Sequence, residues 1–220
     1  MKNVIFLTVL AASVLNACHK PSQPHYTINA SLKAAFDFQP GTYWIYKDSI
    51  SGEVDSFAVQ TSESGTSTNS SGGYSMDQIF IYIQEYFPSS GTSDYKEWEY
   101  SFFGDEIDLL YYGSNITETN YAPFINFPFQ NPLTYETYAH EVGNIIDSSY
   151  VDNIYDSYSL LGNTFLNVAV VNHALIYLTA INYSDVFYIC PNIGIIKMKL
   201  NHPLDSINRV WELQRWNVVM

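Results

Sequence analysis

The sequence predicts an all-β or β-dominated domain built on an antiparallel sheet of about ten strands. Aromatic residues make up 16% of the 220 residues, and aromatic side chains suit the pleated, half-buried surface of a strand. Short apolar runs also recur along the chain, and residues typical of turns separate them. Hydrophobic residues make up 47% of the chain, which is enough material for a packed core.

The first 17 residues have the pattern of an export signal. Lys2 provides a positive charge, and residues 4–15 form an apolar segment that is too short to span a bilayer core of about 30 Å. The motif at 15–18, Leu-Asn-Ala-Cys, resembles the lipobox of bacterial lipoproteins, in which the cysteine is acylated and the signal is cut before it. The alternative is an ordinary secretory signal whose cleavage site precedes Cys18 by chance.

The lipobox resemblance implies a division of the chain and an address. We predict a lipoprotein signal peptide at 1–17, lipidation of Cys18, a flexible tether at 18–30 and a single β-rich domain at 31–220. Several acyl chains on one cysteine give a stable membrane anchor. The sorting rules of bacterial lipoproteins imply outer-membrane delivery, because His19 replaces an aspartate. The lack of acids just after the cysteine favours the periplasmic face.

Within the domain we expect one short helix at 29–36, with Asn29 as its cap, followed by strands. The first two strands form a hairpin through the turn at 51–53. Residues 65–73 are rich in Ser, Thr and Gly and predict a mobile loop. Residues 114–134 contain three prolines and several aromatics, which indicates a long excursion across the sheet, either a lid or a binding site. The strands are expected at 42–47, 54–59, 78–83, 95–100, 106–111, 148–158, 165–171, 174–181, 186–189, 194–200 and 206–213.

Two motifs carry a second resemblance. Residues 38–48 contain Pro-Gly-x-Tyr-Trp-x-Tyr-x-Asp, and residues 187–197 contain Tyr-x-x-Pro-x-x-Gly-x-x-Lys. Both are similar to motifs of Bacteroidota-type lipoproteins, with Cys190 in place of a small residue. The resemblance implies a strongly curved sheet, like the half-barrel of periplasmic lipoprotein carriers. It implies an architecture rather than an activity.

The formal net charge of −13 is distributed unevenly. Between Asp48 and Ile196 the only Lys or Arg is Lys96, against 19 acids from Asp48 to Asp185. A phosphate backbone is held by clustered Lys and Arg, so this region would repel nucleic acid and anionic head groups. We therefore predict no nucleic-acid partner.

Cys190 has no intramolecular partner if Cys18 carries lipid. It lies in an apolar run directly before Pro191, so we predict a buried thiol in a strand. A nucleophilic role would need a nearby base, and His173 and His202 are the nearest histidines in the sequence.

The sequence offers no complete metal motif. His140-Glu141 begins like a zinc-protease helix, but Asn144 stands where the second histidine must be. The other histidines have no metal-ligand spacing. The acids at 147, 152 and 156, with Asn153, leave an adventitious calcium site as an alternative, although the EF-hand spacing is missing. We predict no metal and no cofactor.

No complete catalytic motif is present either. The acid pairs at 105–106 and 97–99 could serve glycoside hydrolysis only at a spatial separation that the sequence does not reveal. The sequence contains no nucleophile elbow, phosphate loop or dinucleotide fingerprint, and we predict no catalytic residue.

These observations predict a non-enzymatic outer-membrane lipoprotein that binds a hydrophobic ligand or a protein partner. A concave sheet face lined with aromatic side chains would suit acyl chains or the apolar surface of a partner. The alternative is a glycan-binding module, with the aromatics of residues 120–135 stacked on sugar rings. An enzyme is the third alternative, and it would need polar residues that converge in one cleft.

Overall fold

The computed structural model describes residues 24–68, 73–86, 96–104, 106–112, 119–120, 124–129, 138–142, 145–177, 180–202 and 207–220. Strands dominate these residues, as predicted, and the one helix among them is α2 (Ala30–Phe36). No helix in this part of the chain is both long enough and apolar enough to cross a membrane. The strands are β1 (His25–Tyr26), β2 (Tyr43–Asp48), β3 (Val54–Thr68), β4 (Ser75–Tyr86), β5 (Lys96–Phe103), β6 (Glu106–Tyr112), β7 (Thr119–Asn120), β8 (Phe124–Asn126), β9 (Tyr138–Val142), β10 (Ile145–Leu160), β11 (Asn163–Tyr177), β12 (Ala180–Cys190), β13 (Gly194–His202) and β14 (Ile207–Asn217).

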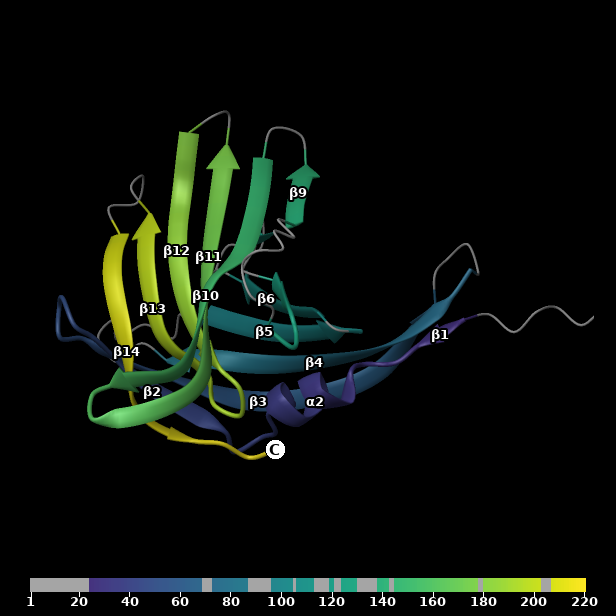
Figure 1. The fold of residues 1–220 in the computed structure, drawn as a ribbon, viewed down its shortest axis with the longest axis horizontal. Helices are drawn as coiled ribbons and strands as arrows, with labels where there is room; N and C mark the ends of the chain where they lie inside the picture. The colour runs from purple at the N-terminus through teal and green to yellow at the C-terminus, as the bar shows by residue number, and fades with distance from the viewer. Residues whose placement is uncertain are drawn as a thin grey trace, which may run out of the picture.

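All of these strands belong to one sheet, in the order β7-β6-β5-β4-β3-β2-β14-β13-β12-β11-β10-β9. β8 also pairs with β6, and β1 pairs in parallel with β4, while every other pairing is antiparallel. The sheet is strongly curved, so that β9–β13 stand across the direction of β3–β5 (Figure 1). The curvature brings β8, at one edge, next to β10, near the other edge. The predicted curved, largely antiparallel sheet is confirmed.

The predicted hairpin of β2 and β3 is confirmed, and a buried carboxylate holds its turn. Asp48 ends β2, and its carboxylate accepts hydrogen bonds from the backbone of Ile50 (3.1 Å) and Val210 (3.0 Å). It also accepts from Ser51 Oγ (2.7 Å) and Arg209 Nη1 (3.1 Å). Burial alone would raise the pKa of Asp48, but these hydrogen bonds outweigh burial and hold the pKa well below its ordinary value. The turn is therefore tied to β14.

Two predicted boundaries are wrong. The strand expected at 174–181 does not exist as a separate element, because β11 continues to Tyr177 and β12 begins at Ala180. The polar residues that interrupt the apolar run of β11 stay in the ladder with β10 and β12. The loop expected at 65–73 is strand as far as Thr68, because β3 keeps its pairing with β4 up to Ser75. Residues 69–72 lie outside the described residues.

Helix α2 spans the two halves of the sheet. Its predicted cap is confirmed, because Asn29 Oδ1 accepts a hydrogen bond from the Ser31 backbone at 2.8 Å. The backbone N–H of Asn29 donates to Gly104 in the β5–β6 turn. At the other end, the Ala35 carbonyl accepts from Asn192 in the β12–β13 turn. The helix is therefore fixed to turns on opposite halves of the curved sheet.

The hydrophobic core lies on the inner, concave face of this sheet. Strands β2 and β4 alternate between buried and less buried residues, which is the period of a half-buried strand. The buried residues of the strands form one cluster with residues of α2 and with Phe38, in the segment that follows it. We call this side of the sheet the inner face and the opposite side the outer face.

The N-terminal predictions lie largely outside the described residues. The signal peptide and Cys18 are not described, and neither are the other residues of the tether before residue 24. The described end of the tether contains β1, where the His25 ring contacts Ser75 Oγ (2.9 Å) and Asp77 Oδ1 (3.2 Å). These contacts join the start of the domain to β4.

Candidate functional site

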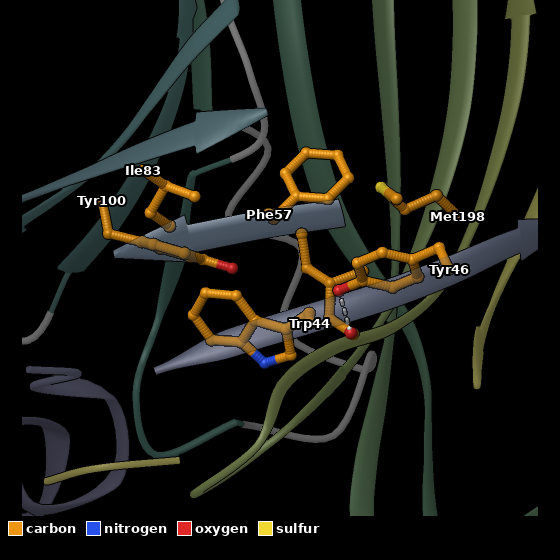
Figure 2. A pocket seen from close by; sticks show the side chains of 7 residues that line it. Trp44, Tyr46, Phe57, Ile83, Tyr100 and Met198 are labelled. Atoms are coloured by element: carbon orange, nitrogen blue, oxygen red, sulfur yellow. Dashed lines mark hydrogen bonds between the residues drawn. The ribbon is translucent and has the colours of Figure 1, made fainter. Parts of the chain in front are cut away.

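The inner face contains a small apolar pocket whose lining residues are all described. The pocket encloses about 20 Å³, room for about one water molecule. The side chains of Figure 2 close in on it from both halves of the sheet. Its lining residues are Trp44, Tyr46, Phe57, Ile83, Tyr100, Ile195 and Met198. An acyl chain does not fit into this space.

The polar atoms of this pocket serve the fold. Tyr46 Oη donates to the Ile195 carbonyl at 2.6 Å, and Trp44 Nε1 donates to the Ile193 carbonyl at 2.5 Å. Burial raises the pKa of Tyr46 well above its ordinary value, and the nearby Tyr100 raises it further. The two sequence motifs therefore meet here, because β2 carries the first and the β12–β13 hairpin carries the second.

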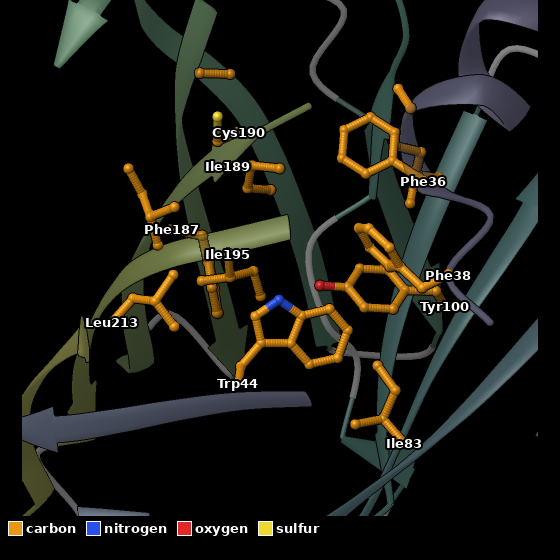
Figure 3. Packing of buried hydrophobic residues seen from close by; sticks show 14 of the residues in the cluster. Phe36, Phe38, Trp44, Ile83, Tyr100, Phe187, Ile189, Cys190, Ile195 and Leu213 are labelled. Atoms are coloured by element: carbon orange, nitrogen blue, oxygen red, sulfur yellow. The ribbon is translucent and has the colours of Figure 1, made fainter. Parts of the chain in front are cut away.

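Aromatic side chains from α2 and the following segments fill the rest of the inner face. Phe36 lies 6.1 Å from Phe38 and 5.5 Å from Phe127, measured between ring centroids. Phe38 in turn lies 5.2 Å from Trp44, edge to face. Figure 3 shows this packing between the helix and the buried strands. These aromatic side chains therefore pack between α2 and the buried strands on the inner face.

The predicted excursion at 114–134 contributes to this filling where it is described. Phe127 and Phe129 lie 5.2 Å apart and pack against the core cluster. β7 and β8 extend the β6 edge of the sheet. The remainder of the excursion lies outside the described residues.

Cys190 is buried at the end of β12, as predicted. Its thiol contacts the Leu166 carbonyl oxygen at 3.4 Å. Burial raises the pKa of this thiol to about 11, although a backbone hydrogen bond with Leu166 opposes the shift. The thiol is therefore protonated at neutral pH and is a poor nucleophile in the folded protein.

A buried polar row that the sequence analysis missed crosses the inner face. His173 on β11 lies opposite both Ser149 on β10 and Asp185 on β12. Their exposed fractions are 1% for Ser149, 3% for His173 and 7% for Asp185. Asp185 Oδ1 accepts a hydrogen bond from the Asn201 backbone at 3.1 Å. Only the strand register brings these residues together, so their sequence spacing gave no signal.

The row has the order of a nucleophile, a base and an orienting acid, but it lacks access. A working triad presents its serine to a substrate and places donors around the developing oxyanion. Ser149 is closed to solvent and lies within a continuous ladder between β9 and β11. The row therefore packs the sheet in this structure.

The other candidates from the sequence are dispersed. The described residues contain no group of three or more His, Cys, Asp or Glu side chains that could hold a metal ion. His140 and Glu141 lie on β9, a strand rather than a helix. Asp152 and Asp156 are exposed on β10. The side chains of the remaining candidates, except that of Glu99, lie outside the described residues: Asp147, His202, Glu97, Asp105 and Glu106. Glu99 is buried and accepts from Ser101 Oγ at 2.5 Å.

The outer face of β2, β14 and β13 carries a second candidate surface, which sequence reasoning also missed. Lys47 on β2, Glu212 on β14, Lys197 on β13 and Tyr188 on β12 form one cross-strand row. Lys197 Nζ lies 2.7 Å from Glu212 Oε1. Burial lowers the pKa of Lys197, but the hydrogen bond to Glu212 outweighs this effect and the net pKa is raised. Lys197 therefore stays charged.

Tyrosine rings border this row. Tyr158, from the distal part of the β10–β11 hairpin, lies 5.1 Å from Tyr188 and 5.5 Å from Tyr155. Lys197 and Lys199 lie 5.9 and 5.6 Å from the centre of the Tyr188 ring. These are cation–π distances, so the ring helps to fix both ammonium groups.

Comparisons with known proteins found no matching family model and no matching curated protein. Two solved structures resemble the fold. One is a candidate lipoprotein from Parabacteroides distasonis, with 17% identity and a TM-score of 0.41, covering 84% of this chain and 99% of its own. The other is a candidate exported protein with a YmcC-like fold from Bacteroides fragilis, with 10% identity and a TM-score of 0.46, covering 83% and 98%. Both TM-scores lie below 0.5, so we base no argument on either likeness.

Proposed function

We propose that this chain is a non-enzymatic, lipid-anchored protein of the bacterial outer membrane that binds a macromolecular partner on its surface. The filled inner face carries this proposal. Pockets for small ligands commonly enclose about 300–1,000 Å³. The pocket between Trp44 and Tyr100 encloses about 20 Å³, and α2 lies across the same face. A hydrophobic cargo inside the sheet is therefore disfavoured.

A titration with a fluorescent fatty acid tests this point. We expect no saturable binding to the full chain in detergent below the critical micelle concentration. Trp44 lies in the pocket wall, so energy transfer from tryptophan to the probe would report an acyl chain in the inner face. Saturable binding of one probe per chain would overturn the proposal of surface binding.

The non-enzymatic part of the proposal has two supports. The thiol of Cys190 is buried and protonated, and the row of Ser149, His173 and Asp185 is closed to solvent. Neither group can meet a substrate without a change of structure. Hydrolysis of p-nitrophenyl acetate by the wild type at the same rate as by Ser149→Ala is the expected result.

The membrane anchor rests on the lipobox-like motif before Cys18. We expect the wild type in the membrane fraction of its host and Cys18→Ala in the soluble fraction or as an unprocessed precursor. Cys190→Ala is the matched control, because it removes the other cysteine and should remain in the membrane fraction. A Cys18→Ala variant with normal processing and membrane retention would refute lipidation at this residue.

A glycan ligand is a second candidate, and the outer-face row of lysines and tyrosines favours it. Tyr155 is 39% exposed and lies at the end of the ring series that leads to Tyr188. Of the aromatics first expected to bind sugars, Phe127 and Phe129 pack on the core, and the side chains of the others lie outside the described residues. The outer face is therefore the better place for a glycan.

A further inference from the structure

The outer face of β2, β14 and β13 concentrates positive charge in an acidic chain. Four of the nine Lys and Arg residues of the protein point to this face, from β2, β13 and β14, although the net charge is −13. We use the name outer strip for the charged residues that point to the outer face of these three strands. The outer strip consists of Lys47, Lys197, Lys199, Arg215 and Glu212.

The strand register places these residues on one face. Lys47 alternates with buried residues of β2, and Lys199 lies two residues from Lys197 on β13. Arg215 lies opposite Ile45, an outer-face residue of β2, and its guanidinium is 6.0 Å from the Tyr43 ring. The formal charge of the outer strip is therefore four positive minus one negative, or +3.

Two of the three lysines in the strip are available to a ligand. Lys47 and Lys199 are both exposed, and within the described part of the chain no carboxylate pairs with either amine. Lys199 lies over the Tyr188 ring, which limits its conformations without neutralising it. Fixed, unneutralised cations in an acidic protein attract an anionic ligand by charge complementarity.

The neighbours of the outer strip are mostly amides and tyrosines, with one exposed valine, Val54, opposite Lys47. Asn201 and Asn208 lie opposite each other on β13 and β14, and both are exposed. Gln214 and Asn217 are exposed further along β14. Amide side chains donate and accept hydrogen bonds, which matches the hydroxyl groups of a sugar.

We propose that the outer strip binds an acidic polysaccharide. Carboxylates of the polymer would pair with Lys47 and Lys199, its hydroxyls with the amides, and its ring C–H groups with the negative faces of the tyrosines. An acidic protein partner would need large apolar side chains as anchors, and the described aliphatic residues in and beside the strip are the half-buried Ile45 and Val210 and the exposed Val54. This inference rests on the surface-binding function proposed above.

Calorimetric titration of the full chain in detergent with polygalacturonate tests the proposal. We expect saturable binding at low salt that weakens as the salt rises. Neutral dextran should not bind, and polyglutamate should bind at least about tenfold more weakly. The double variant Lys47→Gln/Lys199→Gln should lose about tenfold in affinity. Lys33→Gln, at an exposed position of α2, is the matched control and should bind like the wild type.

Four results would overturn the proposal: no binding of polygalacturonate, equal binding of polyglutamate, equal binding of dextran, or equal losses in the double variant and the control. Equal polyglutamate binding would assign the strip to an acidic polypeptide. Circular dichroism and the urea midpoint of each variant confirm that the fold is intact. The fatty-acid titration does not involve the outer strip, so failure here would leave the filled inner face unaffected.

Discussion

Replacement of Asp48 by asparagine tests how the β2–β3 turn is held to β14. Asn keeps the size of the side chain but replaces one acceptor oxygen by an amide NH₂ group. Asp48 Oδ2 accepts from the backbone and hydroxyl of Ser51 and from Arg209, while Oδ1 accepts from Ile50 and Val210. With the amide at the Oδ2 position, the Ser51 and Arg209 donors lose their acceptor.

The magnitude follows from these contacts. Hydrogen bonds to a charged group contribute about 1.5–3 kcal/mol each. Three of them, from the Ser51 backbone, Ser51 Oγ and Arg209, lose their acceptor in Asp48→Asn, so the free energy of unfolding should fall by at least about 3 kcal/mol. Arg209 keeps its contact with Glu53, which prevents a larger loss.

The effect of Asp48 depends on pH with a defined sign. The folded state lowers the pKa of this carboxyl, so the folded state favours its charged form. The stabilisation is fully present above the ordinary pKa of about 3.9 and is lost as the pH falls below that value. The difference between wild type and Asp48→Asn should therefore shrink below about pH 4.

Urea unfolding followed by tryptophan fluorescence at pH 7 and at lower pH measures both effects. Asp152→Asn, an exposed substitution on β10, is the matched control and should stay within about 0.5 kcal/mol of the wild type. An Asp48→Asn variant as stable as this control would refute the role assigned to the carboxylate.

Three further predictions concern the ends of elements. Asn29→Ala removes the α2 cap and should cost about 1 kcal/mol in urea unfolding, whereas Asn29→Ser should retain most of the stability. Gly194→Ala should cost about 1–3 kcal/mol, because residue 194 has a φ of +94° and a Cβ there would lie 3.4 Å from Phe38; an unchanged urea midpoint would contradict this. Cys190 should react with Ellman's reagent only after unfolding, since its thiol is buried and its pKa is raised to about 11. The Cys18→Ala variant leaves Cys190 as the single thiol, and fast reaction of this variant in its native state would contradict the burial of Cys190.

The sequence predicted the elements better than their ends. The hairpin around Gly52 and the cap at Asn29 were predictable, because local backbone chemistry determines a turn and a helix start. The end of β3 at Thr68 was not, since the ladder with β4 overrides the loop-like composition of that segment. The polar His173 likewise seemed to divide a strand, but its neighbours on β10 and β12 keep it within β11.

The candidate surfaces could not be predicted, because both depend on strand register. Lys47 and Lys197 are 150 positions apart in the chain. They lie in one row because β14 pairs with both β2 and β13, which places Glu212 between the two lysines. The filling of the inner face depends on α2, whose short apolar pattern does not reveal which face it covers. Burial of Cys190 was predictable, because an apolar run surrounds it.

Native mass spectrometry of the chain extracted from its own host membrane tests the central claim most directly. The claim is that the inner face is filled and that the protein carries no lipid cargo. The account predicts one species with the mass of the mature chain plus the covalent lipid on Cys18, with no separable lipid. A species that releases an intact phospholipid or fatty acid on gentle activation, at one per chain, would contradict it.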